Sequence, residues 1–188
     1  MAVYTQLDQD DLNQLLNDFD LGSLVNFKGI EGGIENTNYF LSLKKEGVQC
    51  EYVLTLFEEL DHEELPYFIE LCQWLSDRHI DVPFAIQDRN GIGLKKLKNR
   101  PAAIQPRFYG EHVGQADLTA DHCAAIGQVL GEFHVAAADF YLQRQAHRGV
   151  FWWRRESELI APKLSTEDQK LLKDEVHRFD QLRENPSD

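Results

Sequence analysis

Hydrophobic and polar residues alternate along two stretches in the N-terminal third of the chain. Tyr39, Leu41 and Leu43 would share one face of an extended segment. Residues 52–57 form a second segment of this kind, rich in β-branched and aromatic side chains. Residues 44–47, which read Lys-Lys-Glu-Gly, lie between the two and are typical of a turn. The pattern therefore predicts two neighbouring strands.

A helical period replaces the alternation after residue 64. Pro66 is tolerated only in the first turn of a helix, so the helix is predicted to begin near residues 64 and 65. Its apolar positions recur every three or four residues, at Leu65, Phe68, Ile69, Cys72 and Leu75.

Three more extended segments are predicted after this helix. Residues 79–83 lead into one strand. Residues 88–91 read Asp-Arg-Asn-Gly and predict a hairpin turn before a strand at 94–97. Residues 100–108 give the last extended run. Only helical patterns follow, and the change falls near residues 110–116.

Three further helices follow residues that commonly cap a helix N-terminus: Asp8, Thr119 and Ser165. We expect their apolar residues to be buried: Leu12, Leu15, Leu16 and Phe19; then Cys123, Ile126, Leu130, Phe133 and Ala137; then Leu171, Leu172, Val176 and Phe179. The expected fold class is α+β, with an antiparallel sheet and its helix followed by helices alone.

A glycine-rich turn precedes the two strands predicted first. Gly32 and Gly33 lie between two segments of strand character, followed by Asn36 and Asn38. Glycine lets another group approach the backbone closely, and kinase-type folds cover the phosphates of ATP with such a strand–turn–strand. The alternative is a tight hairpin with a bulge, in which both asparagines are only turn residues.

Five segments in order resemble bacterial homoserine kinase of the type built on the aminoglycoside-phosphotransferase fold. They read GIENTNYFLSL, YVLTLFE, ELPYFIELCQWL, IDVPFAI and RPAAIQPRFYGEHV. Choline kinases and aminoglycoside kinases of the same fold are the nearest alternatives. The resemblance implies a protein kinase-like small lobe over residues 1–110 that binds the nucleotide, and part of a helical large lobe over residues 111–188.

The same resemblance implies a reaction. It is the ATP-dependent phosphorylation of the hydroxyl of L-homoserine in threonine biosynthesis, with Mg²⁺ on the phosphates. The family's catalytic His-x-Asp-x-x-x-x-Asn segment and its later metal-binding Asp do not occur in this sequence. We therefore expect a chain truncated before the catalytic loop and inactive alone. No catalytic residue and no metal ligand is assigned within it.

The nucleotide-binding candidates follow from the same resemblance. In kinases a lysine of the third strand pairs with a glutamate of the next helix, and the matching positions here are Thr55 and Glu70. The alternative for Thr55 is a purely structural role. The alternative for Glu70 is a solvated side chain without a function. The full set is Gly32, Gly33, Ile34, Glu35 and Asn36 over the phosphates, then Asn38, Thr55 and Glu70, and Gln105 and Arg107 in the connection that meets adenine.

The composition limits the classes of partner that this chain could bind. The chain has 19 basic and 32 acidic residues and a net charge of −13, which argues against nucleic acid and anionic membranes. No apolar run approaches about 18 residues. Cys72 and Cys123 lie on apolar helix faces and are expected to be buried reduced thiols. These features favour a cytoplasmic protein and leave its oligomeric state open. The resemblance implies that its partners are ATP and a small molecule, homoserine.

Two interpretations remain open from the sequence. The first is the kinase just described, acting on homoserine or on another small hydroxyl or amine acceptor. The second is a non-catalytic module that binds a nucleotide or a partner and performs no chemistry. Trp152 and Trp153 could line a substrate pocket, although adjacent tryptophans at a helix start are more often part of a core.

Overall fold

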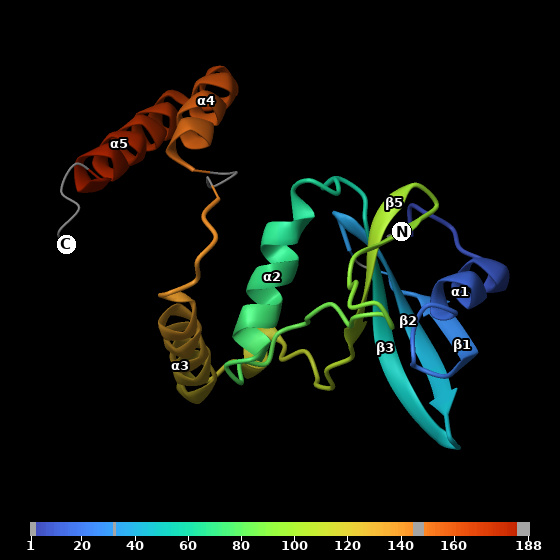
Figure 1. Cartoon of the computed structure of the whole chain (residues 1–188). Helices are drawn as coiled ribbons and strands as arrows, with labels where there is room; N and C mark the ends of the chain where they lie inside the picture. Colours follow the sequence, from blue (N-terminus) through green and yellow to red (C-terminus); the bar gives the residue numbers. More distant parts are fainter. Residues whose placement is uncertain (1–2, 32, 145–148, 184–188) are drawn as a thin grey trace. The chain divides into compact units, whose positions relative to one another are not determined.

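The computed structural model describes residues 3–31, 33–144 and 149–183 (Figure 1). It divides into two compact units, Met1–Leu142 and Gln143–Asp188. The first unit carries the sheet and three helices, and the second carries two helices.

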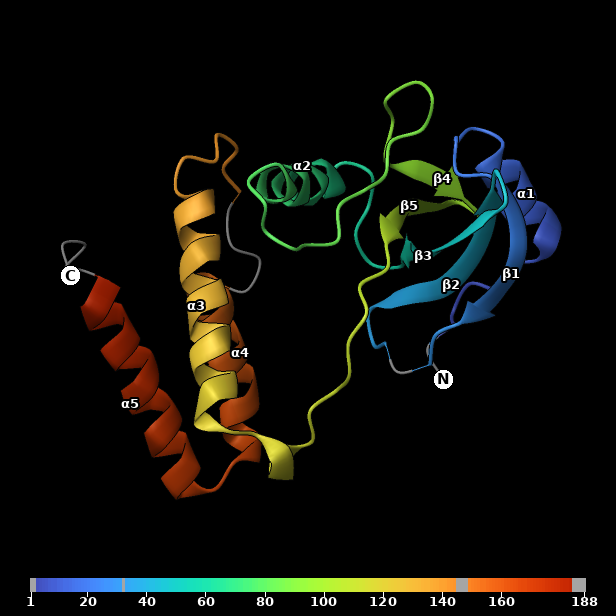
Figure 2. The ribbon, with the colours of Figure 1, turned by 90° about the horizontal axis from the view of Figure 1, so that it is seen from below.

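The sheet of the first unit is antiparallel throughout and has the strand order β1-β2-β3-β5-β4 (Figure 2). Its strands are β1 (Ser23–Gly29), β2 (Asn36–Lys45), β3 (Val48–Phe57), β4 (Lys95–Leu97) and β5 (Arg100–Pro106). The two strands predicted first are confirmed within β2 and β3. The turn between them uses positive φ angles at Glu46 (51°) and Gly47 (87°), as a two-residue hairpin requires.

One predicted strand is wrong. Residues 81–88 form no strand, and a single backbone bond, from Ile86 N–H to the Ile104 carbonyl (2.8 Å), ties them to β5. Pro83 has no N–H to offer to a ladder, which weakens any strand here. The turn predicted at residues 88–91 is present, with Gly91 N–H donating to the Asp88 carbonyl (3.0 Å). The hairpin that joins β4 to β5 turns further on, at Lys98 and Asn99, whose φ angles are 47° and 63°.

The apolar core lies between one face of the sheet and α1 (Gln9–Leu16). The predicted helix positions Leu12, Leu15, Leu16 and Phe19 are all buried there. Asp8 caps α1 through a capping box with Asp11. The sheet contributes alternate residues of its strands, because successive side chains point to opposite faces: Tyr39, Leu41, Leu43, Leu54, Leu56, Ala102 and Ile104.

The second helix, α2 (Leu65–Ser76), begins where Pro66 placed it and lies across the sheet from α1 in Figures 1 and 2. It contacts α3 (Ala120–Ala137), where the Trp74 indole N–H donates to the Ala136 carbonyl (2.8 Å). The rings of Tyr67 and Trp74 pack edge-on against Phe140, just beyond α3. A short 3₁₀ turn, η1 (Gln115–Asp117), precedes α3, which Thr119 caps as predicted.

The buried stripe predicted for α3 holds only at the C-terminal end of the helix, where Phe133 and Ala137 are half-buried. Ile126 and Leu130 are 59% and 53% exposed, and Cys123 is exposed as well. The physical reason is that α2 meets α3 near Ala136, at the other end of the helix. Cys72 on α2 is half-buried, and desolvation raises the pKa of its thiol.

The second unit is a pair of helices, α4 (Val150–Ile160) and α5 (Thr166–Arg183), joined through the 3₁₀ turn η2 (Ala161–Lys163). Ser165 caps α5 and bonds Asp168, which confirms the predicted start of this helix. The Arg154 guanidinium on α4 donates two hydrogen bonds to the Asp180 carboxylate on α5 (3.2 and 2.7 Å).

The predicted burial of this unit holds only in part. On α5, Leu172 and Val176 are half-buried, whereas Leu171 (61%) and Phe179 (52%) are exposed. Trp153 is also 54% exposed, against the expectation that both tryptophans belong to a core. Two helices share only one mutual face, so apolar residues beyond that face stay in contact with solvent.

Candidate functional site

The face of the sheet opposite α1 carries polar side chains at the end nearest the glycine turn. The register places Asn38 of β2 opposite Thr55 of β3, and Thr55 opposite Ala103 of β5. Gln105 of β5 is opposite Val53, two residues along β3 from Thr55. Strand alternation therefore gives Asn38, Thr55 and Gln105 one common face, and we call these three residues the polar row.

The polar row is joined by hydrogen bonds through the Thr55 hydroxyl. Its oxygen lies 2.7 Å from Asn38 Oδ1 and 3.0 Å from Gln105 Oε1. A hydroxyl has one proton to donate and can accept from a second partner. Gln105 Nε2 is directed toward the Pro83 carbonyl (3.4 Å), so Gln105 presents its oxygen to Thr55. The hydroxyl has a donor and an acceptor partner when the Asn38 amide is flipped, so that its N–H group donates to Thr55 and Thr55 donates to Gln105.

Thr55 is therefore a connecting residue between the two amide side chains. It is 6% exposed and brings no charge to this face of the sheet. A neutral, hydrogen-bonded group in this position does not supply what a kinase lysine supplies, a cation on the nucleotide phosphates.

Glu70 is not brought to Thr55. Its carboxylate accepts a hydrogen bond from the Tyr141 hydroxyl (2.6 Å), and its side chain is exposed. That bond raises the pKa of Tyr141. Tyr67 and Trp74, three residues before Glu70 and four after it, pack on the same segment beyond α3. The strand-to-helix pair expected from kinases is absent between these two residues.

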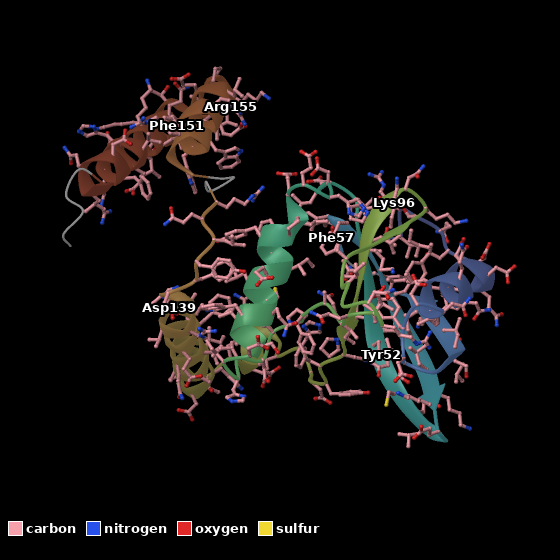
Figure 3. The ribbon with its side chains drawn as sticks, in the orientation of Figure 1. Tyr52, Phe57, Lys96, Asp139, Phe151 and Arg155 are labelled. Carbon is pink, nitrogen blue, oxygen red and sulfur yellow. The ribbon has the colours of Figure 1, made fainter. Side chains whose placement is uncertain are left out.

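The glycine turn lies between β1 and β2. Ile30 N–H donates to the Asn38 carbonyl (2.9 Å), which continues the pairing of the two strands toward the turn. Gly33 is half-buried, Ile34 is 85% exposed and Glu35 is exposed, while Gly32 lies outside the described residues. Asn36 opens β2, where it is opposite Phe57, labelled on β3 in Figure 3.

Arg107 follows β5 and is held in place by aromatic and acidic neighbours. Its guanidinium carbon lies 4.1 Å from the centre of the Phe40 ring and 5.2 Å from that of Tyr109. One of its nitrogens lies 3.4 Å from Glu51 Oε2. Hydrogen bonds from Gln49 and Ser42 hold the pKa of Glu51 below its usual value, with a smaller contribution from Arg107.

The sequence prediction did not include Phe40, Glu51 or Tyr109. A signal for Phe40 was present, because the alternation that puts Asn38 on this face of β2 also puts Phe40 there. The contact with Glu51 depends on how β3 pairs with β5 across a loop and a helix, which no local pattern specifies. The polar row itself was in the candidate set, and the structure brings its three members together.

The described part of the chain offers neither a cluster for a metal ion nor a helix that could span a membrane. Residues 3–31, 33–144 and 149–183 contain no cluster of three or more His, Cys, Asp or Glu side chains that could hold a metal ion. Among the helices that the structure describes, none is long and apolar enough to cross a membrane.

The phosphotransferase enzyme family matches this chain over residues 26–186. The chain belongs to that family. The kinase-like fold inferred from the sequence is thereby confirmed, and kinase-type phosphotransfer is the class of reaction that the family performs.

Curated relatives are homoserine kinases. The chain is 39% identical over 176 residues to the homoserine kinase of Cupriavidus metallidurans, covering 94% of this chain and 53% of the relative. It is 38% identical over 172 residues to that of Pseudomonas aeruginosa, covering 92% and 52%. The resemblance to homoserine kinase stated above is confirmed, and the chain spans about half the length of these relatives.

Solved structures show the same fold at low identity. An amicoumacin kinase in complex with AMP-PNP and Ca²⁺ matches 95% of this chain and 54% of its own, with a TM-score of 0.67 and 15% identity. A choline kinase from Cryptosporidium parvum matches 91% and 50%, with a TM-score of 0.58 and 15% identity. At such identities the likeness concerns the fold alone.

Proposed function

We propose that this chain supplies the nucleotide-binding part of an ATP-dependent kinase that phosphorylates the hydroxyl of L-homoserine. The observation that carries the proposal is the polar row, Asn38, Thr55 and Gln105. It lies on the sheet face opposite α1, next to the glycine turn. Identity near 39% to homoserine kinases along 94% of the chain supports the choice of acceptor.

The phosphates of ATP would meet the glycine turn. Backbone N–H groups of Gly33, Ile34, Glu35 and Asn36 would cover them, together with Gly32. Asn38 would add a side-chain amide from the same face, held by Thr55. Because Thr55 is neutral, the protein's own groups here orient the phosphates by hydrogen bonds and leave charge compensation to other groups.

The base of the nucleotide would lie along the connection after β5. Pro106 has no N–H, so any backbone donor to adenine would come from Gln105 or Arg107. Arg107 is already fixed by Phe40 and Glu51, which reduces the ordering that binding would require. Glu70 is not placed in this site, because its carboxylate bonds Tyr141.

A divalent cation, Mg²⁺, belongs to the proposed reaction, since kinases use it to neutralise the phosphates. The described residues do not gather a carboxylate cluster that fits such an ion. No step is therefore assigned to the metal on this chain. We expect residues 1–188 alone to bind Mg²⁺–ATP weakly and to turn over no homoserine.

The test is a chimera that joins residues 1–188 to the C-terminal half of the Cupriavidus metallidurans homoserine kinase. ADP release would be followed with homoserine, serine, threonine and choline as acceptors. We expect turnover only with Mg²⁺–ATP present and the highest kcat/KM for homoserine. The C-terminal half alone is the matched control and should be inactive.

Two results would contradict the proposal. A folded chimera that prefers choline or another acceptor would overturn the assignment of homoserine. A folded chimera without turnover, together with a chain that gains no thermal stability from millimolar Mg²⁺–ATP, would favour the non-catalytic interpretation.

A further inference from the structure

The N-terminal segment of residues 3–7, here called the strap, is tied to β2 by side chains. It belongs to no strand. The Thr37 hydroxyl oxygen accepts from the backbone N–H groups of Tyr4 (2.9 Å) and Thr5 (3.1 Å). The Tyr39 hydroxyl donates to the Thr5 carbonyl (2.9 Å). The position of the strap is thus set by individual side chains of β2, and a backbone ladder plays no part in it.

Glu58 completes this anchor from the end of β3. Its Oε1 accepts from the hydroxyls of Thr37 (2.6 Å) and Thr5 (2.7 Å). Its Oε2 lies 3.0 Å from the Arg100 Nε. Thr37 is fully buried, and its hydroxyl donates once and accepts twice, so its bonding capacity is used completely.

The strap reaches the glycine turn at two points. The Tyr4 hydroxyl donates to the Ile34 carbonyl (3.2 Å) inside the turn. Val3 fills the space beside Gly29, where an added Cβ would come within 2.7 Å of the Val3 Cγ2 atom. Gly29 ends β1 and Ile34 lies just before β2. The strap therefore contacts the turn from both of its ends.

We propose that Tyr4 is a positioning residue, which acts through Ile34 to hold the glycine turn in one conformation. A loop that is ordered before its ligand arrives loses less entropy on binding. Tyr4 thereby strengthens the binding of nucleotide phosphates, a consequence that rests on the proposed function. The hydrogen bond from Tyr4 to Ile34, here called the tether, is itself independent of what the turn binds.

The variant that tests the tether is Tyr4→Phe, which removes only the hydroxyl. Tyr141→Phe is the matched control, because Tyr141 is a residue of similar exposure (60% against 56% for Tyr4) whose hydroxyl bonds Glu70 elsewhere in the fold. Backbone order parameters of Gly33, Ile34 and Glu35 would be measured by NMR in the chain and both variants. We expect them to fall in Tyr4→Phe and to stay unchanged in Tyr141→Phe.

Nucleotide binding is the second readout. In the chimera described above, Tyr4→Phe should raise the KM for ATP about two- to five-fold, as for one neutral hydrogen bond, and leave kcat unchanged. A purely structural role would lower the melting temperature without this split between KM and kcat.

The two readouts separate the two proposals. Unchanged order parameters in a folded Tyr4→Phe chain would overturn the tether. Lower order with an unchanged KM would overturn its effect on the nucleotide. A wild-type chimera without nucleotide turnover would overturn that effect together with the proposed function, while the order parameters still decide the tether.

Discussion

The two faces of the sheet are built from the same strands and do different work. On the side of α1, Leu41, Leu54, Leu56 and Ile104 are at most 1% exposed and belong to one cluster of buried apolar residues. The opposite face of the same strands carries the polar row, in which Asn38 and Gln105 are linked through the Thr55 hydroxyl. A shift of one residue in register would exchange the two sets, so the apolar face fixes where the polar row lies. Stability and binding are thereby placed on opposite sides of one element.

The comparison predicts that truncating a side chain on the α1 side of the sheet costs far more stability than truncating one on the opposite face. Leu54→Ala removes a fully buried side chain and should lower the free energy of unfolding by about 2–5 kcal/mol. Val53→Ala, its half-buried neighbour on the other face, is the control and should cost clearly less. Urea denaturation measures both, and equal losses would remove the distinction between the faces.

A charged cluster sits beside the end of α1 and gives the next prediction. Asp88 accepts from the N–H groups of Asn90 (2.8 Å) and Ile92 (2.9 Å) and pairs with Lys95 (2.6 Å). The Lys95 ammonium, followed by these N–H groups, lowers the pKa of Asp88 to about 2. A depressed carboxyl pKa stabilises the fold above the unfolded value near 3.8, and this contribution is lost as pH falls toward 2.

Asp88→Asn should therefore lower the melting temperature at neutral pH and flatten its decline between pH 4 and pH 2. Asp20→Asn is the control, because Asp20 forms its ion pair with Lys45 (2.6 Å) at an exposed site. Solvent screening makes such a pair contribute less, so its effect should be smaller. An Asp88→Asn protein with the wild-type pH profile would contradict the role given to this carboxylate.

Substitutions on the sheet face opposite α1 should change nucleotide binding while stability changes little. In the chimera, Gly33→Val should raise the KM for ATP by about tenfold or more, a loss near 1.4 kcal/mol. A side chain at Gly33 would keep the phosphates from the backbone N–H groups that we assign to them. Val48→Ala, in the distant β2–β3 turn, is the matched control. Unchanged ATP kinetics in a folded Gly33→Val protein would reduce the segment to a hairpin.

Much of the division between the apolar and the polar face of the sheet could be predicted from the sequence. Alternation at Tyr39, Leu41 and Leu43 set the buried side of β2, and Thr55 was correctly placed on the face opposite Leu54 and Leu56. The strand predicted after residues 79–83 is wrong, because an apolar run that contains Pro83 occurs both in strands and in extended connections. The partners of Glu70 and Arg107 could not be predicted, because they come from tertiary contacts with Tyr141 and Glu51.

A small effect is expected at Thr55, and it tests how the sheet face opposite α1 binds the nucleotide without a lysine. Thr55→Ala removes two neutral hydrogen bonds, to Asn38 and Gln105, and no charge. We expect a loss below about 1.5 kcal/mol in kcat/KM, measured in the chimera. Thr55→Ser keeps the hydroxyl and should restore most of this loss, while Thr55→Val keeps the shape and should not. If Thr55→Ala instead lowered kcat/KM by several orders of magnitude, the hydroxyl, or a metal that it holds, would be performing the task of the missing lysine. The sheet face opposite α1 would then take part in catalysis through a charged group, which would contradict the neutral role given to the polar row.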